Sequence, residues 1–392
     1  MVYFLLLMGR DQTRFDLKPK EILMSQMVRL LFLIFVSIAC AVETRAVTAP
    51  SKSAKNVQGS ASAPVSHVGA TTGPVKVTPV PMSPQELDTH IMPAGAPPDR
   101  RSVLSVVYNG YRRSSLEPCG CVSHKLGGIN REAQVVERLK ELSLPVVKLE
   151  AGGYIRDNAL ASENFRVASK HLLKALAALD YDVLNVGAPD ALAGKSFLAE
   201  NLGKHADRLV SANIVDPTSS APLFSKYRII EVKLGDGTQV RIGVTGVTRQ
   251  RIGVSPQAPT FQVLDPLPAI KEVVKELQGN CDFIILLAYM NRETLRQTLE
   301  QLGPDPGIDV AIAGEFLGVF HQIDNVNGVR MVSGGFEGRH VGHLLLQMQN
   351  GKISQALNKL VDIEQTIPPH PDYSHFITDY LKELTDSQQP VN

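Results

Sequence analysis

Residues 103–142 decide the fold, and they read VLSVVYNGYRRSSLEPCGCVSHKLGGINREAQVVERLKEL. The run 103–108 is rich in β-branched and other apolar residues, which is typical of a buried strand. Apolar residues return at helical spacing over 129–142 and predict a helix. The loop between these elements, residues 117–128, contains two of the four cysteines of the chain. A strand, a cysteine-bearing loop and a helix therefore follow one another in a sequence that otherwise uses little cysteine.

The alternation of strands and helices continues to the end of the chain. Short apolar runs separated by amphipathic segments indicate an α/β protein, and hairpin signals at 235–237 (GDG) and 350–351 (NG) predict mixed sheets. The expected helices are 129–142, 165–179, 192–205, 267–277, 292–302 and 373–384. The expected strands are 103–108, 146–149, 183–186, 209–214, 227–234, 240–247, 283–288, 310–313, 329–333, 343–349 and 352–357.

The first hundred residues do not follow this pattern. An apolar run from Leu30 to Ile38 follows Arg29, and it is too short to cross a bilayer but typical of a signal-peptide core. The small residues around Cys40 resemble a cleavage site, and Cys40 is alternatively a lipidation site. We expect four parts, namely a targeting segment (1–41), a disordered low-complexity tether (42–101), one folded domain (102–365) and a C-terminal helix and tail (366–392).

Composition excludes some classes of partner. The net charge is +1 and tryptophan is absent, so nothing favours binding to nucleic acid or to an anionic membrane surface. We therefore expect an exported protein, periplasmic or extracellular, that contacts a membrane only if Cys40 carries a lipid.

The order of short motifs resembles the N-terminal catalytic domain of the 5′-nucleotidase / UDP-sugar hydrolase family, a branch of the calcineurin-like metallophosphoesterases. The resemblance covers residues 103 to 357 and implies a four-layer α/β/β/α sandwich. The Cys-Gly-Cys loop before Gly127-Gly128 is similar to a UshA-like subgroup of that family. The matching motifs are GGINR (127–131), VKLEAG (147–152), LDYDVLNVG (179–187), LVSAN (209–213), YRIIEV (227–232), VRIGVTG (240–246), IDVAIAG (308–314) and GFEGRHVG (335–342).

The resemblance implies two divalent metals, such as Mn, Zn or Fe, held by Asp, His and Asn side chains on loops after strands. Most of those donors are absent from this chain. Where the family has Asp-x-His this chain has NGY (109–111), and where the family has its bridging Asp this chain has Gly153. The family's Gly-Asn-His-Glu is replaced by GAPD (187–190), its strand-end His by Tyr289, and its Gly-His-x-His by GEFL (314–317). The resemblance implies hydrolysis of phosphoric esters in nucleotide breakdown, and the missing donors predict that this chemistry is lost.

Three interpretations of the cysteine loop stay open. Cys119 and Cys121 could form a strained, labile disulfide, which is a redox pair with Cys119 as the nucleophile. With His124 they could instead bind a soft metal such as Zn or Cu, completed by Glu117 or Glu315. The third interpretation is a structural disulfide or two inert thiols. A c-type haem is excluded because Cys-x-x-Cys-His is absent.

The main prediction is thus an exported phosphoesterase-fold protein with a thiol redox or soft-metal site and no binuclear hydrolysis. One alternative is an active nucleotide hydrolase with a rebuilt metal site, and another is a non-catalytic binding or scaffold protein. We expect a small phosphoester or a thiol redox partner, and no nucleotide cofactor. Arg112 and Arg113 are candidates for anion contact, or exposed loop charges. A rebuilt metal site would draw on Cys119, Cys121, His124, Asp190, Glu315 and His340.

Overall fold

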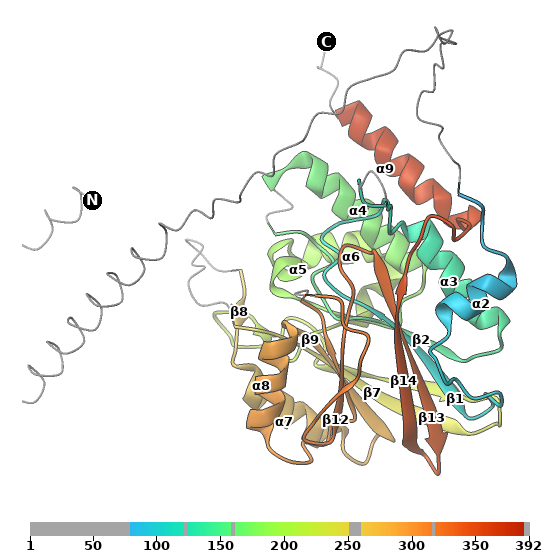
Figure 1. Cartoon of the computed structure of the whole chain (residues 1–392). Helices are drawn as coiled ribbons and strands as arrows, with labels where there is room; N and C mark the ends of the chain where they lie inside the picture. The colour runs from blue at the N-terminus through green and yellow to red at the C-terminus, as the bar shows by residue number, and fades with distance from the viewer. Residues whose placement is uncertain (1–78, 121–123, 158–160, 251–259, 316–317, 388–392) are drawn as a thin grey trace, which may run out of the picture. The chain divides into compact units, whose positions relative to one another are not determined.

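A computed structural model describes residues 79–120, 124–157, 161–250, 260–315 and 318–387. The chain divides into two compact units, 1–75 and 76–392, and the described residues belong to the second. Two six-stranded sheets form the centre of this unit (Figure 1). The expected targeting segment, including Cys40, lies outside the described residues.

The first sheet has the order β14-β13-β1-β2-β3-β4. Strands β1 to β4 are parallel, whereas β13 is antiparallel to both β1 and β14. The sheet is therefore mixed, as the sequence predicts, because the hairpin at Asn350-Gly351 places β13 antiparallel to β1, and β14 antiparallel to β13. Its strands are β1 (Val103–Asn109), β2 (Val146–Glu150), β3 (Val183–Asn185), β4 (Leu209–Val210), β13 (His340–Gln349) and β14 (Lys352–Asp362).

The second sheet has the order β11-β12-β10-β9-β7-β6. Its four central strands are parallel, and β6 and β11 close the edges in antiparallel pairs. The hairpin expected at residues 235–237 joins β6 to β7. The strands are β6 (Tyr227–Lys233), β7 (Gln239–Thr248), β9 (Phe283–Tyr289), β10 (Val310–Ala313), β11 (Asp324–Val326) and β12 (Val329–Ser333), and a separate small sheet pairs β5 (Ile214–Val215) with β8 (Gln262–Val263).

Helices cover the outer face of each sheet, which gives the expected four layers. Alternating residues of β1 point to opposite sides, so Val106 packs against the second sheet and Val107 packs against α3. Helices α7 and α8 pack on the outer face of the second sheet. The helices are α2 (Pro84–Ile91), α3 (Ile129–Glu141), α4 (Glu163–Ala178), α5 (Ala188–Leu192), α6 (Lys195–Leu202), α7 (Pro266–Leu277), α8 (Arg292–Leu302), α9 (Ser374–Ser387) and the 3-10 segments η2 (Gly203–Arg208) and η3 (Pro371–Tyr373).

The expected tether extends too far toward the folded domain. Residues 84–91 form α2, which begins with a capping box at Ser83 and buries Leu87 and Ile91 against the first sheet. Two apolar residues in a polar, proline-rich segment give too weak a periodicity for sequence to reveal a helix. Tertiary packing also divides the helix expected at 192–205 and the strand expected at 209–214 into shorter elements. Among the described residues no helix combines the length and apolarity needed to cross a membrane.

Candidate functional site

The loops that follow the parallel strands meet at one edge of the sheets, and Tyr289 lies among them. This residue ends β9 and is 1% exposed. A Cβ atom added to Gly153 would lie 2.3 Å from Cε2 of Tyr289, and one added to Gly187 would lie 2.8 Å from its Cγ. The aromatic ring therefore fills the space where the family resemblance implies a bridging carboxylate and an imidazole.

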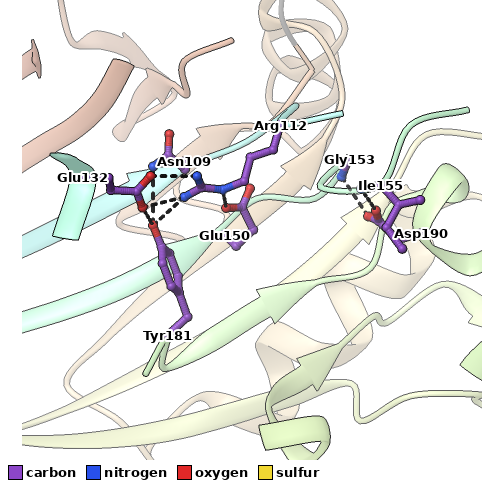
Figure 2. Close-up of polar contacts among 8 residues, drawn as sticks. All are labelled: Asn109, Arg112, Glu132, Glu150, Gly153, Ile155, Tyr181 and Asp190. Atoms are coloured by element: carbon purple, nitrogen blue, oxygen red, sulfur yellow. Dashed lines mark hydrogen bonds and ion pairs between the residues drawn. The ribbon is translucent and has the colours of Figure 1, made fainter. Parts of the chain in front are cut away.

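Asp190 is held by backbone groups of two loops in this region. Its Oδ2 accepts a hydrogen bond from the N–H of Gly153 at 2.7 Å, and its Oδ1 accepts one from the N–H of Ile155 at 2.8 Å (Figure 2). Oδ2 also accepts a hydrogen bond from the N–H of Gly187 at 2.8 Å. Burial raises the pKa of Asp190 to about 8, although the three donors favour its charged form. Both carboxyl oxygens thus tie the β2 loop to the β3 loop.

The loops of the two sheets approach each other through glycine. Gly110, after β1, lies so close to Gly314, after β10, that an added Cβ would be 2.7 Å from the Gly314 Cα. Gly314 in turn faces the carbonyl oxygen of Ala151, which a Cβ would approach to 2.4 Å. Backbone contact therefore occupies part of the volume in which a cleft for two metals would lie.

Glu315 is engaged by a charged neighbour. Its Oε1 accepts a hydrogen bond from Nη2 of Arg249 at 2.7 Å, and its side chain is 11% exposed. His340, at the start of β13, is buried with its Nε2 3.3 Å from Oδ1 of Asp362, and burial lowers the pKa of His340. Among the described residues, neither Glu315 nor His340 forms a group with Asp190 that could hold a metal ion.

The side chains at the family's ligand positions do not fit a two-metal site. Tyr289 offers a ring in place of an imidazole, and burial raises the pKa of its hydroxyl, so the anionic form that could bind a metal is disfavoured. Across the described part of the chain, no group of three or more His, Cys, Asp or Glu side chains could hold a metal ion. Cys121 and Leu317 lie outside that part.

Next to this filled region, Arg112 is fully buried in a cluster of polar side chains (Figure 2). Its Nη1 and Nη2 donate to the two carboxylate oxygens of Glu132 at 2.7 Å each, its Nε donates to Glu150 at 2.6 Å, and Nη2 also donates to the hydroxyl of Tyr181. Burial raises the pKa of Glu150 to about 7, although Arg112 opposes this shift. The two expected roles for Arg112, anion contact or exposed charge, are therefore wrong, because its donors face internal carboxylates.

The cysteine loop follows shortly after Arg112 in the chain. Cys119 is half-buried, and its Sγ accepts a hydrogen bond from the N–H of Leu126 at 3.2 Å. The same Sγ lies 3.6 Å from the carbonyl oxygen of His124, whose own side chain is exposed. The loop thus folds back on itself before α3, and Cys119 and His124 lie near each other through this backbone contact.

Cys119 also lines a pocket of about 280 Å³. The lining includes three arginines and two glutamates. It comes from the loops after β1 and β2, from α4 and α9, and from the loop before β13. Its charged and aromatic members are Arg113, Arg156, Arg339, Glu117, Glu337, Phe165 and Tyr380. Sequence reasoning found Arg113 but missed the other two arginines, because positions 113, 156 and 339 become neighbours only in the folded chain.

Comparison with known proteins shows to which class of folds this chain is similar. No family model matches the chain. A 2′,3′-cyclic-nucleotide 2′-phosphodiesterase/3′-nucleotidase of Yersinia enterocolitica is 24% identical over 246 residues, which cover 55% of this chain and 38% of that relative. A 5′-nucleotidase precursor from Thermus thermophilus has a TM-score of 0.61 at 20% identity, covering 73% of this chain and 60% of that one. The calcineurin-like phosphoesterase YfkN from Bacillus subtilis has a TM-score of 0.59 at 20% identity, with 73% and 98% covered.

The described residues thus have the fold of the calcineurin-like phosphoesterases. Within that class, the resemblance to the 5′-nucleotidase family is confirmed by the curated relatives and by the solved structures. The chain spans about two fifths of the length of the curated relatives that it matches. Its place in a Cys-Gly-Cys subgroup remains a prediction.

Proposed function

We propose that this protein is a non-hydrolytic member of the 5′-nucleotidase-like group, in which the fold is retained and the two-metal site is closed. The observation that carries the proposal is the ring of Tyr289 packed against Gly153 and Gly187. An Asp at position 153 would collide with that ring. A binuclear site needs several oxygen and imidazole donors around an open volume that admits water and phosphate. The packing of Tyr289 against Gly153 and Gly187 supports the proposal, because the ring occupies part of that volume.

Hydrolysis can be tested directly on the purified chain. The substrates are 2′,3′-cyclic AMP, 3′-AMP, 5′-AMP and bis(p-nitrophenyl) phosphate, each with Mn²⁺, Zn²⁺ or Mg²⁺. We expect no turnover above a protein-free blank. The matched control is the Asp190→Asn variant, which lacks a carboxylate from the family region. Metal-dependent turnover that this variant loses would revive the hydrolase with a rebuilt site and refute the proposal.

A second candidate function is a thiol site on the Cys-Gly-Cys loop. The hydrogen bond from the Leu126 N–H to Sγ of Cys119 favours this candidate, because an N–H donor stabilises a thiolate. In the redox form, the Cys119 thiolate attacks a disulfide of the partner and releases one partner thiolate. Cys121 then attacks the mixed disulfide, which leaves a Cys119–Cys121 disulfide and the second partner thiol. In the metal form, Cys119, Cys121 and His124 bind Zn or Cu.

Elemental analysis without chelator, with a count of free thiols, separates these forms. One zinc or copper per chain with protected thiols supports the metal form, and the Cys119→Ser variant should lose that metal. A reducible disulfide without metal supports the redox form, and Cys119→Ser should then abolish thiol–disulfide exchange. Unchanged behaviour of a folded Cys119→Ser variant contradicts both forms and leaves a binding or scaffold role.

The proposal also includes export. Residues 30–41 have the features of a signal peptide, and Cys40 is the proposed lipidation site if the protein is anchored. The expected partner is a small molecule or a thiol redox protein, and no nucleotide cofactor or nucleic acid is involved. Cell fractionation of wild type and of a Cys40→Ala variant tests this part, because only a lipidated protein should leave the membrane fraction after the substitution.

A further inference from the structure

We infer that the pocket beside Cys119 binds a small tetrahedral oxyanion, either inorganic phosphate or sulfate or the phosphate or sulfo group of a small organic molecule. We call it the arginine pocket, after Arg113, Arg156 and Arg339 in its lining. The inference does not rest on the proposed function. The lining of the arginine pocket includes none of the family's metal-ligand positions, such as Gly153, Asp190 or Tyr289.

The three arginines share too few acceptors. All three surround Glu337, but only Nη2 of Arg339 is within hydrogen-bond distance of this carboxylate, at 2.9 Å. Nε of Arg113 lies 4.0 Å and Nη2 of Arg156 lies 3.8 Å from Oε1 of Glu337. Within the described residues, the Nε atoms of all three arginines are buried and have no hydrogen-bond partner. Buried donors of this kind are rare and call for a ligand, an ion or a water.

The charge of the pocket also favours an anion. Three guanidinium groups and the two carboxylates of Glu337 and Glu117 give a net charge of +1 if both carboxylates are ionised. Burial raises the pKa of Glu117, which weakens the negative contribution of this residue. Close positive charges in a half-enclosed pocket attract an anion more strongly than they would in open solvent.

Aromatic rings hold each guanidinium in place. The Cζ atom of Arg113 lies 5.3 Å from the ring centre of Tyr111, that of Arg156 lies 4.5 Å from Phe165, and that of Arg339 lies 4.8 Å from Phe336. A guanidinium stacked on a ring keeps its N–H groups at its edge, in the plane of the group. One of these groups, Nη1 of Arg113, donates to the Tyr111 hydroxyl at 3.0 Å. Three guanidinium groups from separate loops suit an anion with several acceptor oxygens. A planar carboxylate suits them less well, because one or two guanidinium groups already use all of its acceptor positions.

The backbone around the pocket is strained and preorganised. Arg113, Ser114 and Glu337 have left-handed φ angles of 52°, 62° and 48°, which non-glycine residues rarely adopt. Strain of this kind persists only where surrounding contacts fix it, and it gathers at functional sites. Here the N–H of Arg113 donates to the Gly153 carbonyl at 3.0 Å, and the N–H of Glu337 donates to the Tyr111 carbonyl at 3.1 Å. The backbone at Arg113 and at Glu337 is therefore fixed by contacts among the described residues.

The size of the pocket limits its occupant. A volume of about 280 Å³ lies just below the range of sites for larger organic molecules, which begins at roughly 300 Å³. Phe165, Ala168 and Tyr380 add an apolar side to the charged lining. The chemistry thus suits a compact anion, free or attached to a small apolar group.

The test is calorimetric titration of the full chain with sodium phosphate, sodium sulfate and sodium acetate in a chloride buffer of low ionic strength. We expect saturable binding of phosphate or sulfate at one site per chain, and binding of acetate at least about tenfold weaker. A preference for phosphate identifies a phosphoryl ligand, and a preference for sulfate identifies a sulfo ligand. Either preference supports the inference. Acetate binding as tight as both oxyanions, or no saturable binding of any of them, overturns it.

Substitutions in the pocket test the inference a second time, because different substitutions are expected to lower or to raise the affinity for the oxyanion. Arg156→Gln and Arg339→Gln should each weaken oxyanion binding by about tenfold or more, because a charge-assisted hydrogen bond is lost. Glu337→Gln should tighten binding several-fold, because it removes a competing carboxylate. Arg166→Gln is the matched control, since this arginine on α4 pairs with Glu163 outside the pocket. Unchanged affinity in folded Arg156→Gln and Arg339→Gln variants refutes the site.

Discussion

Arg112 and Arg113 are neighbours in the sequence, yet they belong to two regions of opposite character. Arg112 is fully buried, and its donors meet Glu132, Glu150 and Tyr181. Arg113 faces the arginine pocket, where its Nε finds no hydrogen-bond partner within the described residues. In the first region every guanidinium nitrogen of Arg112 has a partner, although Oε1 of Glu150 has none within the described residues. In the second region the Nε donors of three arginines have none. The comparison separates a cluster that stabilises the fold from one that is built to receive a ligand.

The filled family cleft belongs with the Arg112 cluster. Tyr289 and Asp190 there meet internal partners, as Arg112 does. Unsatisfied buried polar groups are costly, and within the described residues this region still has such groups, among them Oε2 of Glu315 and Nε of Arg249. The arginine pocket differs because three unpartnered Nε donors of the described residues lie around one cavity. The predictions below test this difference, beginning with the largest expected change in stability.

The Arg112→Met variant should lose about 4 kcal/mol of unfolding free energy. Removing one partner of a buried charge cluster leaves the carboxylates of Glu132 and Glu150 without compensation. Urea denaturation followed by circular dichroism measures the loss. Arg166→Met, at an arginine whose side chain is 45% exposed, should change stability by less than about 0.5 kcal/mol. Equal effects of the two substitutions would show that Arg112 does not stabilise the fold.

The Tyr289→Ala variant should lose about 3 kcal/mol, because a large buried aromatic side chain is replaced by a cavity. Tyr289→Phe keeps the ring and should cost less than about 1 kcal/mol by the same reasoning. Thermal and urea unfolding of the two variants measure both values. If Tyr289→Ala were as stable as the wild type, the ring would not fill the cleft as the structure indicates.

His343 should make stability depend on pH. Its ring nitrogens contact the Ser105 hydroxyl at 2.9 Å and the Ile91 carbonyl at 2.8 Å, and burial lowers the pKa of His343 to about 4. The unfolded chain binds this proton near pH 6.5 and the folded chain near pH 4, so the stabilisation present above pH 6.5 is lost as the pH falls through this window. The loss should reach about 3 kcal/mol at most.

Urea midpoints measured from about pH 7 to about pH 4 check this prediction. A His343→Gln variant should show a shallower fall across that window than the wild type. His375→Gln, at an exposed position on α9, is the control and should keep the wild-type slope. Parallel curves for wild type and His343→Gln would exclude His343 as the titrating group.

The smallest effect is expected in the arginine pocket. Arg113→Gln, Arg156→Gln and Arg339→Gln should each change the unfolding free energy by less than about 1 kcal/mol, because partly exposed ion pairs contribute little. The same variants should bind oxyanions more weakly, by about tenfold or more for Arg156→Gln and Arg339→Gln. If these variants lost several kcal/mol of unfolding free energy, the pocket would stabilise the fold as the Arg112 cluster does. The difference between the two regions would then be refuted.

Much of the fold could be predicted from the sequence, because the signals are local. The apolar run at 283–288 and the hairpin residues Asn350-Gly351 predicted β9 and the β13–β14 pair by their own chemistry. Helix α2 was missed because its two buried residues, Leu87 and Ile91, matter only against the sheet they cover. The family resemblance likewise followed from short motifs in chain order, and the comparisons confirmed it.

The site was harder to predict. Sequence indicated that the family's metal ligands are missing, but it could not show that Tyr289 occupies the space around Gly153 and Gly187. The predicted metal-binding residues Asp190, Glu315 and His340 each lie among separate partners. Their interactions come from loops that are distant in sequence. The proposed roles of Cys119 and Cys121 remain predictions.

The sequence by itself determined the order of strands and helices, the resemblance to the family and the different residues at the family's donor positions, because each of these depends on local periodicity or on residue identity at a motif. Only the tertiary structure decided that the Tyr289 ring occupies the space beside Gly153 and Gly187. The arginine pocket joins residues 113, 156, 337, 339 and 380, which no spacing along the chain connects. Whether a buried polar group has a hydrogen-bond partner depends on which loops of the two sheets meet. This is therefore a property of the folded chain.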